Sequence, residues 1–247
     1  ERHIENDKID TRVPVVVIGA GAAGLCAALS AKEMGVDVVV IERDAVPSGS
    51  TALSAGLIPA AGTRFQRAKG IADTPGLFAE DIQRKAHNEA DPGLVEAVAQ
   101  ASGPLVEWLA ERYGLPFDVV DNFNYPGHSA LRMHGLPSRA GRELIDRLRA
   151  AAETSDIAIL TERVAQRLLA APDGRIAGVE IIRKDGVHEN IGCEAWILAC
   201  NGYGGSPDLV RRFIPDLADA RYFGDPGNRG DAVRWGESLD ARLAHPG

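Results

Sequence analysis

Residues 15–42 read VVVIGAGAAGLCAALSAKEMGVDVVVIE, and this stretch decides the fold. Val15–Ile18 is a short apolar run rich in β-branched residues, which is typical of a strand buried on both faces of a parallel sheet. Val38–Ile41 has the same character, and the residues between the two runs hold a glycine-rich turn and a helical segment that ends at Gly35. The pattern predicts strand, turn, helix and strand, the first unit of an α/β fold.

The glycine-rich turn has the spacing Gly-x-Gly-x-x-Gly, and each glycine has a physical reason. Gly19 permits the tight turn, Gly21 lets the backbone approach a pyrophosphate, and Gly24 lets the helix pack close to the strand. The helix N-terminus offers N–H groups and the positive end of its dipole to phosphates. Glu42 ends the second strand, where an acid can bind the ribose hydroxyls of an adenosine. The unit therefore predicts a dinucleotide site.

Two other interpretations of this stretch are open at this point. Val13–Ala31 contains no charged residue and has the length of a membrane helix. Its three glycines, Pro14 and the polar continuation at Lys32 and Glu33 argue against that interpretation. A helix and strand that bind no nucleotide would show the same local pattern.

The composition limits the class of protein. The chain has 247 residues, of which 45% are apolar and 25% charged, as is ordinary for a soluble globular protein with one large or two smaller domains. A net charge of −8 argues against nucleic acid or an anionic membrane surface as a general partner. Cys26, Cys193 and Cys200 are few and lie in apolar contexts, which favours thiols in a reducing compartment and a cytoplasmic location. An exported mature form is the alternative, because the sequence begins with Glu.

Outside residues 13–42, helical periodicity is confined to two parts of the chain. Apolar residues recur at helical spacing over 75–113, and Asp91 followed by Pro92 is typical of a helix start within that range. Glu143–Thr154 predicts an amphipathic helix with Leu144, Ile145, Leu148 and Ala152 on one face. The remaining expectations are a flexible leader at 1–12, a loop or short helix at 43–64, and irregular chain at 117–140.

Three strand-like runs follow, at about 163–171, 175–183 and 187–193, separated by Pro-Asp-Gly and Lys-Asp-Gly turns. They predict a three-stranded antiparallel β-meander over about 163–193. A further apolar strand, 195–200, then returns the chain to the parallel sheet.

Four stretches of sequence match the motifs of one known family. They are the glycine unit with Glu42, then GSTALSAG at 49–56 continued by AAGT at 60–63 and FQRAKGIADTP at 65–75, AWILACNG at 195–202, and GNRGD at 227–231. With these motifs the chain resembles the flavoprotein family of the soluble fumarate reductases, the succinate dehydrogenase flavoprotein subunit, urocanate reductase and the ketosteroid dehydrogenases. The resemblance covers nearly the whole chain and corresponds to the N-terminal half of the family.

The resemblance implies a fold and a cofactor. We expect an α/β, Rossmann-like FAD-binding domain over 13–240, made of a parallel sheet and the β-meander, with 241–247 as the start of a cap or catalytic part that is missing or separate. Positions carried over from the family motifs imply FAD contacts at Gly19, Gly21, Ala22, Gly24, Glu42, Arg43, Ser50, Thr51, Gly56, Val164, Ala199, Gly202 and Asp231.

The chain departs from the family motifs at several positions. Leu57 stands where the family has the second glycine of a Gly-Gly pair, and Cys200 and Asn201 replace a threonine and a glycine. The membrane-bound branch joins its flavin covalently to a histidine, and Ser50 stands at that place here. We therefore expect FAD to be bound non-covalently.

The resemblance also implies a reaction. Family members act on a carbon–carbon bond, reducing an activated C=C bond or dehydrogenating in the reverse direction, and the loop at 49–75 favours a small carboxylated substrate over a ketone such as a steroid. An FAD-binding subunit or fragment that is inactive until a second polypeptide supplies the C-terminal half is the alternative. A third interpretation is a dehydrogenase that binds NAD through the same glycine spacing.

Catalytic residues are not identified by the sequence. The candidates are Arg132, His134 and Arg139, because they lie in a Gly- and Pro-rich loop and an arginine fork suits a substrate carboxylate. The structural interpretation of the same loop is a helix cap at Ser138 with solvated arginines. No metal site, nucleic-acid partner or membrane insertion is expected.

Overall fold

The computed structural model describes residues 9–244 of the chain. Most of the predicted leader, and residues 245–247 of the segment that begins at 241, lie outside the described residues. The leader was predicted to end at residue 12, but strand β1 begins at Thr11, because Thr11 and Arg12 pair with Ile191 and Gly192. The described chain forms two compact units, one of residues 9–53 and 145–244 and one of Ser54–Leu144. The predicted domain bounds stay a prediction.

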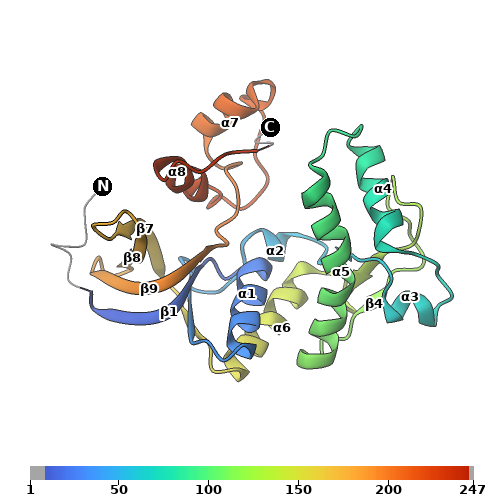
Figure 1. Ribbon diagram of the computed structural model, residues 1–247, viewed down its shortest axis with the longest axis horizontal. Coiled ribbons are helices and arrows are strands. Elements are labelled where there is room, and N and C mark those ends of the chain that lie inside the picture. The colour runs from blue at the N-terminus through green and yellow to red at the C-terminus, as the bar shows by residue number, and fades with distance from the viewer. Residues whose placement is uncertain (1–8, 245–247) are drawn as a thin grey trace. The chain divides into compact units, whose positions relative to one another are not determined.

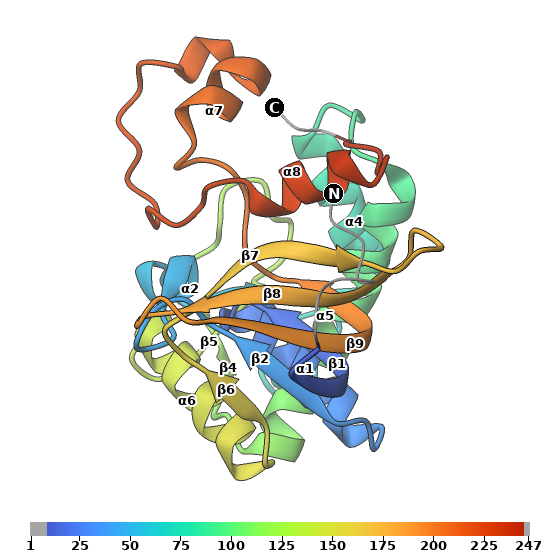
Figure 2. The same cartoon turned by 90° about the vertical axis from the view of Figure 1, so that its left-hand side faces the viewer.

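The first unit is built on a six-stranded sheet with the order β6-β2-β1-β9-β8-β7. Figure 1 shows β1, β9, β8 and β7 of this sheet, and Figure 2 labels all six strands. The strands β6, β2, β1 and β9 are parallel to one another, and β8 and β7 continue the sheet antiparallel. Their bounds are β1 Thr11–Ile18, β2 Val38–Ile41, β6 Ala158–Leu160, β7 Arg163–Ala170, β8 Ile176–Arg183 and β9 His188–Leu198. The predicted α/β class and antiparallel β-meander are confirmed.

Strand β9 corrects one expectation. The sequence predicts two strands, 187–193 and 195–200, whereas the structure has one continuous strand from His188 to Leu198. Glu194 is exposed, so its carboxylate remains in water and does not interrupt the pairing with β1. The same strand therefore closes the β-meander and completes the parallel sheet.

The glycine turn brings helix α1 (Ala22–Glu33) close to the sheet. Gly19 has a φ of +106°, and a Cβ atom there would lie 2.5 Å from the carbonyl oxygen of Ala199 at the end of β9. A Cβ on Gly24 would overlap the carbonyl oxygen of Gly19. Both glycines are therefore required by backbone contacts, as the turn and the close packing predict.

The other helices of the first unit are short, except the one that enters it from the second unit. They are α2 Gly49–Leu53, α7 Pro207–Phe213, a 3-10 turn at Pro215–Leu217, and α8 Asp231–Ser238. Helix α6, Gly141–Thr154, spans the boundary between the units and begins two residues before the predicted 143. Its four predicted apolar residues, Leu144, Ile145, Leu148 and Ala152, are buried, which confirms the predicted amphipathic face.

The second unit contains a helical pair and a small sheet. Helices α4 (Pro75–Lys85) and α5 (Pro92–Tyr113) cover the range predicted to be helical, and the Asp91 side chain caps α5 by accepting the N–H of Leu94 at 2.9 Å. Helix α3 is Arg64–Ala68. The segments predicted as loops or irregular chain also contain short strands, β3 Ile58–Pro59, β4 Asp118–Val119 and β5 Met133–Gly135, in the order β3-β5-β4.

A buried ion-pair network lies inside the second unit. The fully buried Arg132 donates to both oxygens of Asp73, at 2.9 and 3.0 Å, and to Asp81 at 2.6 Å. Its guanidinium also lies 4.7 Å from the centre of the Phe78 ring. Burial alone would raise the pKa of Asp81, but hydrogen bonds from Ser129, Arg84 and Arg132 outweigh it and hold that pKa well below its usual range.

Gly24→Ala should destabilise the first unit, because its methyl group would overlap the Gly19 carbonyl. We expect the free energy of unfolding to fall by about 1–3 kcal/mol, as for overpacking in other well-packed sites. Urea unfolding followed by circular dichroism measures it. Gly76→Ala is the matched control, since Gly76 also lies in the first turn of a helix but is exposed. Equal effects of the two substitutions would contradict the close contact.

Asp81→Asn should remove a source of acid sensitivity. The folded pKa of Asp81 is depressed, so its contribution to stability is complete above the ordinary carboxyl pKa of 3.8 and is lost as the pH falls through the folded value. At pH 7 the free energy of unfolding of the variant should be about 3 kcal/mol lower than that of the parent protein, because Arg132 loses a buried charged partner. Below pH 4 the difference in unfolding free energy from the parent protein should shrink. A difference that is the same at pH 7 and pH 3 would exclude this role.

Candidate functional site

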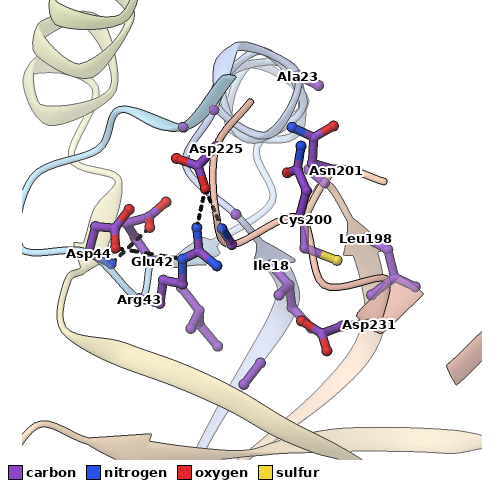
Figure 3. Close-up of a pocket in the computed structure, with 18 of the residues that line it drawn as sticks. Ile18, Ala23, Glu42, Arg43, Asp44, Leu198, Cys200, Asn201, Asp225 and Asp231 are labelled. Atoms are coloured by element: carbon purple, nitrogen blue, oxygen red, sulfur yellow. Dashed lines mark hydrogen bonds and ion pairs between the residues drawn. The ribbon is translucent and has the colours of Figure 1, made fainter. Parts of the chain in front are cut away.

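A cavity of about 580 Å³ opens in the first unit, at the carboxyl ends of β1, β2 and β9. This is the edge of an open α/β sheet at which ligands bind. Its walls come from the ends of these strands, the N-terminus of α1, helix α2, the start of β7 and the segment 225–231. Figure 3 shows several of these side chains around the opening.

The N-terminus of α1 supplies the hydrogen-bond donors of the cavity. Thr51 accepts the N–H of Ala22 at 3.0 Å through its hydroxyl oxygen. The N–H groups of Ala23 and Gly24 have no protein partner within residues 9–244, as expected for the first turn of a helix. A Cβ on Gly21 would have only the Thr51 hydroxyl nearby, at 3.6 Å, so the backbone there is open to a ligand. These donors suit an anion.

Glu42 also lines the cavity, and backbone donors hold its carboxylate in place. One carboxylate oxygen accepts the N–H of Ala20 at 2.9 Å and the other accepts the N–H of Asp44 at 2.9 Å. The Glu42 carbonyl in turn accepts the N–H of Arg163, which ties the start of β7 to the end of β2. Each carboxylate oxygen keeps a further lone pair, so Glu42 can still accept hydroxyl groups of a sugar.

Ser50 connects helix α2 to two asparagines. Its hydroxyl oxygen accepts the side-chain N–H groups of Asn201 at 2.6 Å and of Asn228 at 3.4 Å. Asn201 has a φ of +68°, a left-handed conformation that glycine adopts freely and that asparagine tolerates better than most residues. This explains why asparagine can replace the family's glycine at this position.

The charged side chains of the cavity are more acidic than basic. Arg43 pairs with Asp225, 2.5 Å between Nη2 and Oδ1, and lies 3.6 Å from Asp44. Asp231, at the first position of α8, and Glu42 add two further acids. Cys200 also lines the cavity, and burial, with a smaller contribution from the charge of Asp231, raises the pKa of its thiol. An anion in this cavity would therefore be stabilised mainly by backbone N–H groups.

Most of the residues expected to contact a cofactor line this cavity. They are Gly19, Gly21, Ala22, Glu42, Arg43, Ser50, Thr51, Val164, Ala199 and Asp231. Gly24 and Gly202 belong to the same unit but are not in the cavity wall, and Gly56 belongs to the second unit. Sequence reasoning missed Asn201, Asp225, Asn228 and Trp235, of which the two asparagines stand within the motifs that it used.

The three catalytic candidates belong to the second unit. Arg132 is fully buried and bonded within its network, so the solvated arginine of the structural interpretation is wrong for this residue. His134 is also buried, its Nδ1 donates to the Arg132 carbonyl at 2.9 Å and its Nε2 bonds the Thr63 hydroxyl at 2.8 Å, and burial lowers its pKa. Arg139 is exposed and donates to Asn122 at 3.1 Å. Their catalytic role stays a prediction.

The structure contains no helix, among the described residues, that is long and apolar enough to cross a membrane. Val13–Ala31, which the sequence allowed as a membrane helix, instead covers most of β1, the glycine turn and most of α1. No group of three or more His, Cys, Asp or Glu residues within 9–244 is arranged to hold a metal ion.

Comparison with known proteins gives consistent relatives. The chain is 30% identical to a probable fumarate reductase of Shewanella frigidimarina, over 94% of this chain and 40% of the relative, and 29% identical to the urocanate reductase of Eggerthella lenta, over 95% and 39%. The structure matches the open conformation of a flavocytochrome c3 fumarate reductase with a TM-score of 0.87 and 28% identity, covering 94% of this chain and 41% of that chain.

A second structural match supports the fold alone. A 3-ketosteroid Δ4-(5α)-dehydrogenase of Rhodococcus jostii RHA1 has a TM-score of 0.87 at 23% identity, covering 98% of this chain and 56% of that one. The chain spans about two fifths of the length of the curated relatives named above. A family model described as an FAD binding domain matches residues 14–246. The chain therefore belongs to this family of FAD-binding domains, and its cofactor is FAD.

Proposed function

We propose that the cavity of the first unit holds FAD with its diphosphate at the N-terminus of α1 and its adenosine ribose at Glu42. The observation that carries this proposal is that two features line one cavity. One is the N–H group of Ala23, which has no protein partner within residues 9–244, and the other is the carboxylate of Glu42, which the N–H groups of Ala20 and Asp44 hold in place. A diphosphate needs hydrogen-bond donors and the hydroxyl groups of a ribose need acceptors, and this cavity offers both.

The protein's part in the chemistry is binding and orientation. The N–H groups of α1 bind the diphosphate. Thr51 and Ser50 hold helix α2 in place through their hydrogen bonds to Ala22 and Asn201. Ile18, Val164 and Leu198 supply apolar wall against the adenosine and exclude water from it. FAD, when bound, supplies hydride transfer. The absence of a histidine at Ser50 supports non-covalent binding.

The relatives suggest the reaction. Fumarate reductases and urocanate reductase, named among the most similar proteins, support an oxidoreductase that reduces an activated C=C bond, or dehydrogenates in reverse, on a small carboxylated or ketone substrate. Because the chain spans about two fifths of these relatives, the alternative is an FAD-binding subunit or fragment completed by a second polypeptide. No disulfide joins the cysteines of the described chain, which supports a cytoplasmic location over an exported form.

A spectrum and a screen test this function. Purified protein should show flavin absorption, and acid denaturation should release all of the flavin as FAD and leave an unmodified polypeptide mass. After the bound FAD has been reduced, one of a set of unsaturated carboxylic acids or enones should reoxidise it. Flavin without reoxidation, and with a second polypeptide in the mass spectrum of the native complex, would favour the subunit alternative. A colourless protein that binds no added FAD would overturn the assignment.

Glu42→Gln should weaken FAD binding. An amide has one acceptor oxygen, so it cannot hold the N–H groups of Ala20 and Asp44 and also serve the ribose hydroxyls as a carboxylate does. We expect the Kd for FAD, measured by fluorescence quenching, to rise about tenfold. Glu194→Gln makes the same charge change at an exposed position of β9 and is the control. An unchanged Kd for Glu42→Gln would remove Glu42 from the cofactor site.

A further inference from the structure

Residues 222–230 form a strap, the name used here for this segment between α7 and α8. Its backbone is joined to the turn after β9 at two points. The N–H of Gly205 donates to the Asn228 carbonyl at 2.8 Å, and the N–H of Gly230 donates to the Gly202 carbonyl at 3.1 Å. The strap is therefore anchored on one side of the cavity, by the strand that runs beside β1.

The first side-chain contact across the cavity is the ion pair of Arg43 and Asp225, drawn as a dashed line in Figure 3. Arg43 follows β2, whereas Asp225 belongs to the strap, and both line the cavity. The Asp225 side chain is also held within the strap, because its Oδ1 accepts the N–H of Gly227 at 2.8 Å. A Cβ on Gly227 would overlap the Arg43 guanidinium, so the strap and the arginine are in direct contact.

The second contact joins the strap to α2. The Asn228 side-chain amide donates to the Ser50 hydroxyl at 3.4 Å and to the hydroxyl of Tyr222 within the strap. Asn228 is buried although it lies in a loop. The strap therefore reaches, at separate points, both parts of the chain that follow β2: the arginine at the strand end and the helix of the glycine-rich loop.

We propose that the strap closes the mouth of the cofactor cavity and that Asp225 and Asn228 are positioning residues that set the rate of FAD exchange. They act through Arg43 and Ser50, which they hold in the cavity wall. The inference rests on the proposed placement of FAD in this cavity. It adds a property that the binding of FAD does not itself require, which is a barrier common to entry and release.

The strength of the contacts suits a device that opens. The Asp225 side chain is 13% exposed and that of Arg43 33%, so the ion pair is partly screened by water and is weaker than a buried pair. Among the described residues, the strap is held across the cavity by this ion pair, by the contact of Gly227 with Arg43 and by the long hydrogen bond from Asn228 to Ser50. Opening the strap therefore breaks few contacts, whereas the core of the sheet stays intact.

Kinetics separate a strap from a direct ligand. In Asp225→Asn and Asn228→Ala, the association and dissociation rate constants for FAD should both rise about fivefold, with Kd changed less than twofold, because a barrier common to both directions falls. FAD fluorescence is followed in a stopped-flow instrument, on mixing with apoprotein and on dilution of the holoprotein. Asp216→Asn, an exposed aspartate of the preceding 3-10 turn, is the control and should leave both rates unchanged.

Each other outcome overturns the inference in a recognisable way. A rise in the dissociation rate alone would mean that these residues bind FAD directly, and unchanged rates would mean that the strap is no barrier. A lowered Tm of the apoprotein variants would assign them a structural role. Hydrogen exchange on the unsubstituted protein needs no variant: the amide of Gly227, which donates to the Asp225 side chain, should exchange faster than the amides of β1, and FAD should slow it. A protein that takes up no FAD would instead overturn the cofactor site itself.

Discussion

The structure depends on a close approach of backbone to backbone between the glycine turn and the end of β9. Gly19 lies against the carbonyl of Ala199, and Gly24 lies against the carbonyl of Gly19, with no room for a Cβ atom at either position. This contact fixes where α1 begins relative to the sheet. It thereby places the N-terminus of α1 and the carboxylate of Glu42 around the same cavity.

Local pattern was sufficient to predict the elements that this contact joins. The short apolar runs and the hairpin turns between them predicted the strands, the glycine spacing predicted the turn before α1, and Asp91 with Pro92 predicted the start of α5. The prediction was wrong where polar residues were taken to mark the end of a strand. Glu194 and the Thr11–Arg12 pair stand inside strands, because ladder bonds to a neighbouring strand outweigh the polarity of side chains that face water.

The site was less predictable, because side-chain partners come from distant parts of the chain. Arg132 has the sequence context of an exposed loop arginine, yet two aspartates that precede it by tens of residues hold it inside the second unit. Asn228 stands within the GNRGD motif and Asp225 lies just before it, but neither position indicates its partner, because Arg43 and Ser50 lie near the other end of the chain. Such pairs depend on tertiary contacts, which one sequence does not encode as a period or a spacing.

The place of β9 in the sheet has a consequence for biosynthesis. During synthesis, one edge of β1 can pair with β2 soon after both have been made. Its other edge stays unpaired until β9 has been made, because Ile18 pairs with Leu198. A ribosome adds about 5–20 residues per second, so the apolar edge of β1 stays unpaired for on the order of ten seconds or more. The nascent chain is open to mispairing and to chaperones throughout that interval, and a mutation that slows the pairing of β9 would reduce yield without touching the cavity.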